Sequence, residues 1–241
     1  MYHMTYTDIQ NKINSAEYLD FGELLQESIK KFKDIWLTGL MMVLVLFSFG
    51  FVLSFLFNSM GISSSPLTEV YDQEFNIFNQ LIITSFNLLP LTICISSLTI
   101  GILAGFYRTC KHLDLNQPSQ NDLFYYFASG HTRKILMLGI FHAVITTVAQ
   151  YLFFIPFIYA FVPLQFFAIV FSNNTHLTEI DIVKISFSLG TKKWLLSFGL
   201  LVVTGILGML GVIACGVGLF FTLSLIYLPV YFIYRNVVGF E

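Results

Sequence analysis

The chain has little charge for its length. Only 11% of its 241 residues are Asp, Glu, Lys or Arg, whereas a soluble domain carries about 25%. Hydrophobic residues make up 56% of the chain, and the mean hydropathy is +0.77. This composition excludes an ordinary soluble globular protein and predicts an integral membrane protein.

Several motif classes are also missing. The three cysteines, Cys94, Cys110 and Cys215, are an odd number without a CxxC spacing, so no disulfide framework or zinc site is predicted. HExxH, GxSxG, P-loop and GxGxxG patterns are absent, and no cofactor is expected. No apolar stretch precedes Trp36, so the first membrane helix is expected to act as the targeting signal. Nothing indicates a nucleic-acid partner.

Four long runs contain no charged residue: Trp36–Phe57, Ile77–Tyr107, Ile135–Phe171 and Trp194–Tyr234. A hydrocarbon core about 30 Å thick needs about 20 helical residues. The first run therefore holds one span, and the second holds one span with a tilted or interfacial portion before Pro90. The last two runs are long enough for two spans each. The predicted fold is all-α, with six spans as three hairpins in one domain (20–241), near 36–57, 88–107, 135–153, 157–171, 194–212 and 216–234.

Two parts of this assignment need comment. The run from Ile135 to Phe171 fits either a compressed hairpin or one span with an interfacial stretch. A hairpin is favoured because basic residues flank the run at both ends, which puts both ends on one side. Residues 1–19 are polar without an apolar period, and we expect a cytoplasmic tail that is partly ordered at best.

A short unit recurs before the apolar runs. Asp122–Leu136 and Asp181–Leu195 align without a gap and share Ser129/Ser188, Thr132/Thr191, the basic pairs Arg133-Lys134/Lys192-Lys193, and Leu136/Leu195. Glu23–Leu37 is a looser copy with the same acidic start and basic cluster. Each unit predicts a cytoplasmic amphipathic helix that lies in the membrane interface and leads into a hairpin.

The basic residues indicate the orientation. With a cytoplasmic N-terminus, all 12 Lys and Arg residues fall on the inner side, as the positive-inside rule requires. Both termini are then cytoplasmic, in a cell (inner) membrane. The same residues are candidate contacts for anionic lipid headgroups, although they could serve topology alone. The candidates are Lys30, Lys31, Lys33, Arg108, Lys111, Arg133, Lys134, Lys192 and Lys193.

No charged residue falls inside a predicted span, which weakens the case for ion-coupled transport or intramembrane proteolysis. The polar residues left at membrane depth are Asn87, His142, Gln150 and Gln165. They could line a small polar cavity, or simply bond between helices. Small residues at spacings of three or four predict close helix packing within the chain or between copies. These helix-packing candidates are Gly101, Gly105, Gly205, Gly208 and Gly211.

The last predicted hairpin carries Gly211-Val-Ile-Ala-Cys-Gly-Val-Gly218, then Leu228-Pro229-Val230 and Tyr234-Arg235. Together with Asp122-Leu-Phe, these residues resemble those of a broad group of bacterial six-helix membrane proteins. That group is similar to the membrane domain fused to some glycerophosphodiester phosphodiesterases. The resemblance implies a six-helix fold and a bacterial inner-membrane location. It implies no catalytic residue, since the chain has no room for a phosphodiesterase domain.

Three functions remain open at this point. The favoured one is a non-enzymatic membrane protein that organises or senses lipid, or serves as a membrane subunit for a protein partner or as a homo-oligomer. A small transporter or permease component is the alternative, since internal repeats are common in transporters. A membrane-embedded lipid-modifying enzyme is the second alternative, and it would have to use the acids and histidines near the inner surface: His112, Asp114, Asp122 and His131.

Overall fold

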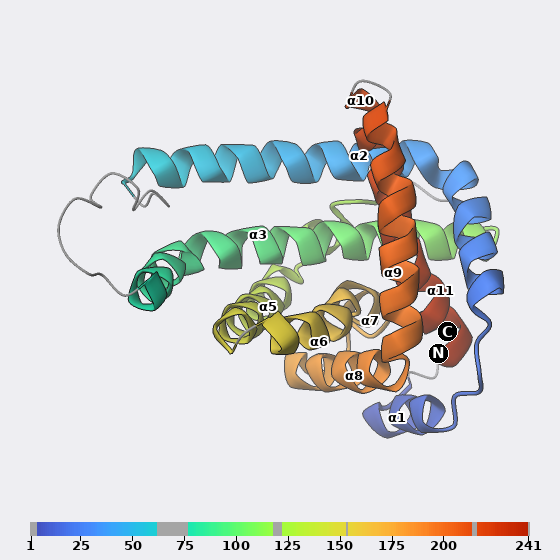
Figure 1. Cartoon of the computed structure of the whole chain (residues 1–241). Helices are drawn as coiled ribbons and strands as arrows, with labels where there is room; N and C mark the ends of the chain where they lie inside the picture. Colours follow the sequence, from blue (N-terminus) through green and yellow to red (C-terminus); the bar gives the residue numbers. More distant parts are fainter. Residues whose placement is uncertain (1–3, 62–76, 118–121, 153, 214–215, 241) are drawn as a thin grey trace.

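The computed structural model describes residues 4–61, 77–117, 122–152, 154–213 and 216–240, and within these ranges every regular element is a helix (Figure 1). Side chains are not described for residues 77–85, 154, 213 and 217. Six helical stretches are long and apolar enough to cross a membrane, which confirms the prediction of an all-α polytopic chain. They are Phe21–Ser59, Phe86–Asp114, Thr132–Tyr151, Ile155–Asn173, Trp194–Val212 and Gly218–Val237.

The N-terminal segment is more ordered than the sequence suggested. Helix α1 (Tyr6–Asn14) begins with a capping box, in which Thr5 and Asp8 satisfy each other's backbone N–H groups. Ile9 and Ile13 are fully buried, and α1 packs against α8 (Glu179–Lys192). Part of the expected tail therefore forms a regular helix, because Ile9 and Ile13 lie four positions apart and pack one face of it against the protein.

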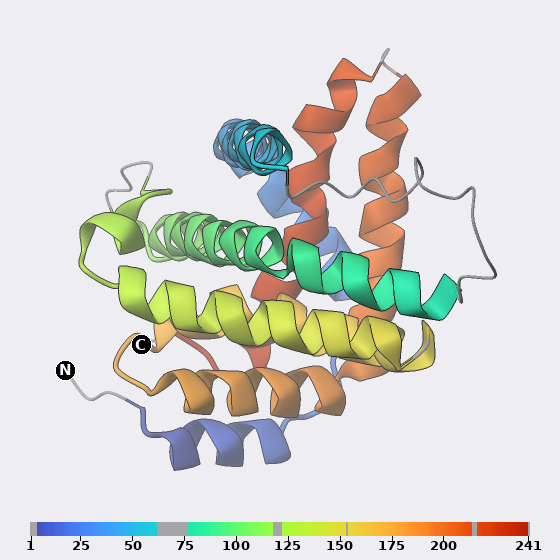
Figure 2. The same cartoon turned by 90° about the vertical axis from the view of Figure 1, so that its left-hand side faces the viewer.

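Helices α2 (Phe21–Ser59) and α3 (Ile77–Asp114) are the longest elements. Helix α2 combines the polar Glu23–Leu37 unit and the first predicted span without interruption, and Figure 1 shows its first turns bent away from the rest. Helix α3 continues through Pro90 and bends in its first half (Figure 2), since proline removes a backbone hydrogen bond and kinks a helix without ending it.

The third uncharged run forms two candidate spans. Helix α5 (Thr132–Tyr151) is followed by α6 (Phe154–Gln165) and α7 (Phe167–Asn173), and α6 packs back against α5. Helix α5 ends at Tyr151, close to the predicted turn between the third and fourth spans. Before α5, the repeated unit holds only α4 (Tyr125–Ala128) among the described residues, so a single helical turn stands where an amphipathic helix was predicted.

The C-terminal run is also interrupted. Helix α9 (Trp194–Met209) continues into η1 (Leu210–Ile213), and the chain returns through α10 (Val217–Thr222), η2 (Leu223–Tyr227) and α11 (Leu228–Val237). Gly216, at the start of α10, has φ of +78°, a left-handed conformation that glycine adopts without steric cost. Helix α9 runs across the direction of α2 in Figure 1, so the helices do not form a parallel bundle.

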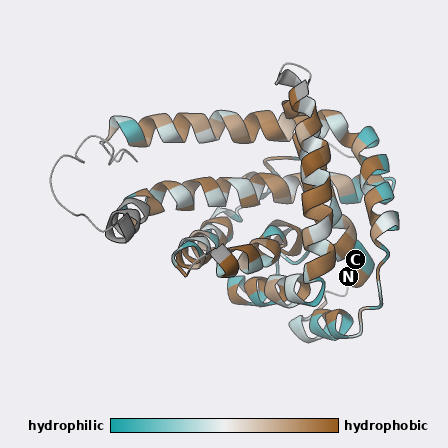
Figure 3. Cartoon of the chain, viewed as in Figure 1, coloured by the Kyte–Doolittle hydropathy of each residue, from teal (hydrophilic) through white to brown (hydrophobic). Residues whose placement is uncertain are grey.

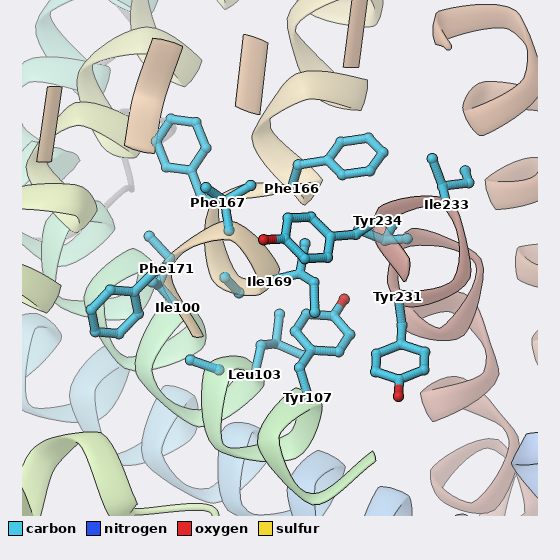
Figure 4. Packing of buried hydrophobic residues seen from close by; sticks show 14 of the residues in the cluster. Ile100, Leu103, Tyr107, Phe166, Phe167, Ile169, Phe171, Tyr231, Ile233 and Tyr234 are labelled. Atoms are coloured by element: carbon cyan, nitrogen blue, oxygen red, sulfur yellow. The ribbon is translucent and has the colours of Figure 1, made fainter. Parts of the chain in front are cut away.

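Large buried side chains of α3, α7 and α11 meet in the core. Figure 4 shows side chains from all three helices in contact, including the fully buried Tyr107, Phe171 and Tyr234. Lipid is as apolar as these side chains, so close packing stabilises such a core more than transfer out of water does.

Away from this core the helices present hydrophobic side chains outward. Phe51 and Phe55 on α2 are 67% and 65% exposed, and Ile206 and Met209 on α9 are 58% and 65% exposed. Figure 3 shows hydrophobic positions along α2, α3 and α9, while hydrophilic positions gather on α1, α8 and the first turns of α2. Apolar surface of this extent on a single chain is typical of a lipid-facing protein.

Candidate functional site

The polar segments between the spans contact one another. Lys111 Nζ donates to Asn173 Oδ1 at 3.2 Å, and Tyr126 Oη donates to the Ser172 carbonyl at 2.7 Å, which joins the end of α3 and α4 to the end of α7. Lys12 Nζ donates to the Val238 carbonyl at 2.7 Å, which joins the two ends of the chain. We call this region the polar cap. It comprises residues 4–34, 108–117, 122–134, 172–193 and 235–240.

A cluster of charges binds three helices together within the polar cap. The Asp114 carboxylate on α3 accepts hydrogen bonds from Lys31 on α2 at 2.5 Å, and from Tyr231 and Arg235 on α11 at 2.6 and 3.5 Å. Arg235 also donates to Glu27 at 2.6 Å. The Lys31 residue is only 8% exposed. Since charged hydrogen bonds away from water are strong, this cluster fixes α2, α3 and α11 relative to each other.

The structure divides the nine candidate lipid-binding residues into two groups. One group bonds within the protein. Lys31 and Lys111 have the partners given above, Arg108 pairs with Asp122 at 3.3 Å and lies over the Tyr125 ring, and Lys134 and Lys193 bind backbone carbonyls. The other group is exposed and has no bonded partner in the part of the chain that the structure describes: Lys30, Lys33, Arg133 and Lys192.

The aligned basic pairs of the two repeats behave alike. In each pair the first residue, Arg133 or Lys192, is exposed. The second residue turns inward: Lys134 Nζ donates to the carbonyls of Thr175 and Leu177 at 2.7 and 2.6 Å, and Lys193 Nζ donates to those of Ala16 and Glu17. Burial, and then the charge of Lys192, lowers the pKa of the Lys193 ammonium. The repeat thus has one cation that holds a loop and one that faces outward.

The polar residues at membrane depth do not form one bonded cluster. His142 Nδ1 lies 3.1 Å from Ser96 Oγ on α3, and its ring meets Phe167 edge-on. Asn87 and Gln150 are exposed, and Gln165 is half-buried. No hydrogen bond joins any two of these four in the described chain. The His142–Ser96 contact is the kind of interhelical hydrogen bond that contributes about 0.6–2 kcal/mol in a membrane.

The glycine positions differ in how closely their neighbours approach. A Cβ added at Gly105 would lie 2.5 Å from the carbonyl oxygens of Asp122 and Leu123, and one at Gly101 would overlap the Phe127 ring. Gly211 lies against the backbone of Gly218. At Gly205 and Gly208 the nearest atoms would be 3.4 Å away, an ordinary contact distance. The closest fit of all, Gly139 of α5 against Ser97 of α3, was not among the predicted positions.

Of the four acids and histidines named for a lipid enzyme, Asp114, Asp122 and His131 have partners within the protein. Asp114 and Asp122 pair with cations, and His131 Nδ1 bonds to Ser129 Oγ at 3.0 Å. Among the described residues, no group of three or more His, Cys, Asp or Glu side chains is placed to hold a metal ion.

Among the cavities formed by the described residues, three lie at or beside the polar cap. The largest, about 620 Å³, lies between residues 18–21 and the α8–α9 junction. A second, about 400 Å³, lies between residues 12–19 and the C-terminal segment, and a third, about 360 Å³, lies beside the Asp114 cluster. Neither His142 nor Gln165 lines any of the three. No sequence pattern predicts the Asp114 cluster, because the packing of distant helices brings Glu27, Tyr231 and Arg235 to Asp114.

Comparison with protein-family models, with curated proteins and with solved structures found no match to this chain.

Proposed function

We propose that this chain is a non-enzymatic multi-pass membrane protein that binds anionic phospholipid headgroups through its polar cap, in a bacterial inner membrane. In this proposal the six spans form three hairpins, each entered from the cytoplasm, and both termini are cytoplasmic. A lipid-organising or lipid-sensing role, or service as the membrane subunit of a partner, follows from such a surface.

The observation that carries the proposal is the grouping of the polar segments. The segments 108–134 and 172–193 are predicted to lie on the same side of the membrane. Their described residues are in direct contact through Lys111–Asn173 and Tyr126–Ser172. The Lys12–Val238 bond brings the two chain ends to each other as well. Basic residues gathered on one membrane face attract anionic lipid by about 1 kcal/mol each.

The exposed cations are the groups available to lipid. Lys30, Lys33, Arg133 and Lys192 are solvent-exposed and lack bonded partners in the described residues, so an anionic headgroup can approach them without breaking an existing contact. Transport has weaker support, because the cavities of about 620, 400 and 360 Å³ lie at or beside the polar cap and none of these three is lined by His142 or Gln165.

The test is the lipid that stays bound after purification from the native membrane in mild detergent. We expect the ratio of anionic to zwitterionic lipid on the protein, measured by mass spectrometry, to exceed that of the membrane extract. Changing Lys30, Lys33, Arg133 and Lys192 together to Gln should return the ratio to that of the extract.

A matched control changes exposed acids. Glu17→Gln with Glu23→Gln also alters charge on the polar cap but should keep the enrichment. Equal lipid ratios on the protein and in the extract, before any substitution, would refute the proposal. A protein recovered in stoichiometric amount in the same preparation would favour the role of a membrane subunit.

A further inference from the structure

The 620 Å³ cavity has the two kinds of wall that an amphiphile needs. One wall comes from the irregular segment before α2 and the first residue of α2, with Tyr18 and Phe21. The other comes from the α8–α9 junction, with Lys192, Lys193 and Trp194. Both charged side chains in its lining are lysines. The cavity therefore offers positive charge at one wall and aromatic and aliphatic surface over the rest.

The two lysines of the basic wall can still bind an anionic ligand. Lys193 Nζ already donates to the carbonyls of Ala16 and Glu17, which lie next to the opposite wall. Among the described residues, no carboxylate pairs with its ammonium group. Lys192 is exposed and makes no bond to a described residue. Two adjacent lysines without an acid in the lining are complementary to a phosphate group.

An apolar track leads away from the cavity along α9. Leu195, Val202, Ile206 and Met209 are 78%, 44%, 58% and 65% exposed, and their spacing of seven, four and three residues places them on one helix face. At about 1.5 Å per residue this face extends for about 21 Å, which is more than half of a hydrocarbon core about 30 Å thick. An acyl chain can lie along it for the depth of one leaflet.

Aromatic residues mark the level of the headgroups at the same place. Trp194 stacks on Tyr159 and Phe198, and its Nε1 donates to the Tyr159 carbonyl at 3.1 Å. Tyr18 is 87% exposed at the rim of the cavity. Amphipathic aromatic rings prefer the membrane interface, so the lysines lie where a lipid phosphate would be found.

We infer that this cavity is a discrete binding site for one anionic phospholipid. Lys192 and Lys193 bind its phosphate, and an acyl chain lies along the Leu195–Met209 face of α9. The inference rests on the proposed lipid-binding function and adds to it a defined site. A free inorganic anion would satisfy the lysines but would leave the apolar lining and the α9 track without an occupant.

The chain offers a direct probe, because it contains only two tryptophans and Trp194 lines the cavity. In the full-length Trp36→Phe protein, Trp194 is the sole tryptophan. Phosphatidylglycerol with brominated acyl chains is titrated into detergent micelles that carry this protein, and brominated phosphatidylcholine is titrated in parallel. Bromine quenches a tryptophan that it touches. We expect phosphatidylglycerol to reach half-quenching at a mole fraction at least about fivefold lower than phosphatidylcholine.

The repeat provides the matched control. Lys192→Gln should lower the preference for phosphatidylglycerol over phosphatidylcholine by about fivefold, which corresponds to about 1 kcal/mol for one basic residue. Arg133→Gln changes the aligned exposed cation of the other repeat, which does not line this cavity, and should leave the quenching curve unchanged. Inorganic phosphate at millimolar concentration should not displace the brominated lipid.

Equal quenching by the two lipids, an unchanged curve for Lys192→Gln, or displacement by inorganic phosphate would each overturn the assignment. If the purified protein still retained excess anionic lipid, the defined site would be wrong while the general lipid-binding function stood. Loss of that retention as well would refute both.

Discussion

Replacing Asp114 with Asn tests whether the charged cluster holds the polar cap together. The substitution keeps the shape of the side chain but removes the negative charge that faces Lys31 and Arg235. The Lys31 and Asp114 side chains are 10% and 22% exposed. Breaking a fully buried pair costs about 3–5 kcal/mol, and an exposed pair contributes about 0–1 kcal/mol. This partly buried pair lies between these limits, so we expect a loss of about 2–3 kcal/mol.

The free energy of unfolding is measured in mixed micelles with an increasing fraction of sodium dodecyl sulfate, followed by circular dichroism. Asp122→Asn is the matched control, since its partner Arg108 is more exposed and lies at 3.3 Å, and its loss should stay below about 1 kcal/mol. Lys31→Met combined with Asp114→Leu removes both charges and should recover much of the stability lost in Asp114→Asn, because no unpaired charge is left. Equal small losses for the two Asp→Asn variants would refute the role assigned to the cluster.

Two further predictions concern packing and capping. Gly139→Ala should destabilise the protein by about 1–3 kcal/mol, because the added Cβ would lie 2.8 Å from the Ser97 Cα. The control is Gly50→Ala, which has no atom within 4 Å of the added Cβ and should be neutral or stabilising by up to about 1 kcal/mol. The same unfolding assay compares the two variants. Equal effects of the two substitutions would contradict the close α3–α5 contact. Thr5→Ala removes the capping box of α1 and should lower the local stability of this helix by about 1 kcal/mol. The loss is measured as faster amide hydrogen exchange at Ile9 and Ile13. Unchanged exchange at these residues would contradict the role of the cap.

Local composition was sufficient to predict the six candidate membrane spans. Uncharged runs gave all six candidate helices, and the break after Tyr151 lies close to the turn expected from the length of the third run. The bend near Pro90 also follows from the chemistry of proline. These features depend on residues close in sequence, so a single chain is enough to predict them. The three-hairpin arrangement and the interfacial helices stay predictions.

Features that depend on distant contacts were not predictable. Lys31 belongs to a basic cluster that predicts a headgroup-binding surface. In the structure it pairs with Asp114, which is 83 residues away in the sequence. The same holds for Lys134 and Lys193, whose carbonyl partners lie in other segments. Helix α1 could have been recognised from the Thr5–Asp8 capping pattern together with Ile9 and Ile13, a signal easily lost in a polar stretch.

We propose that the whole polar cap lies on the cytoplasmic side of the membrane. Single cysteines at Thr132, Lys192 and Ser59, all exposed, are introduced after the three native cysteines are changed to Ser. Treatment of intact cells with a membrane-impermeant maleimide should label Ser59→Cys alone, while Thr132→Cys and Lys192→Cys should react only after permeabilisation. Labelling of Thr132→Cys and Lys192→Cys from opposite sides would contradict this orientation.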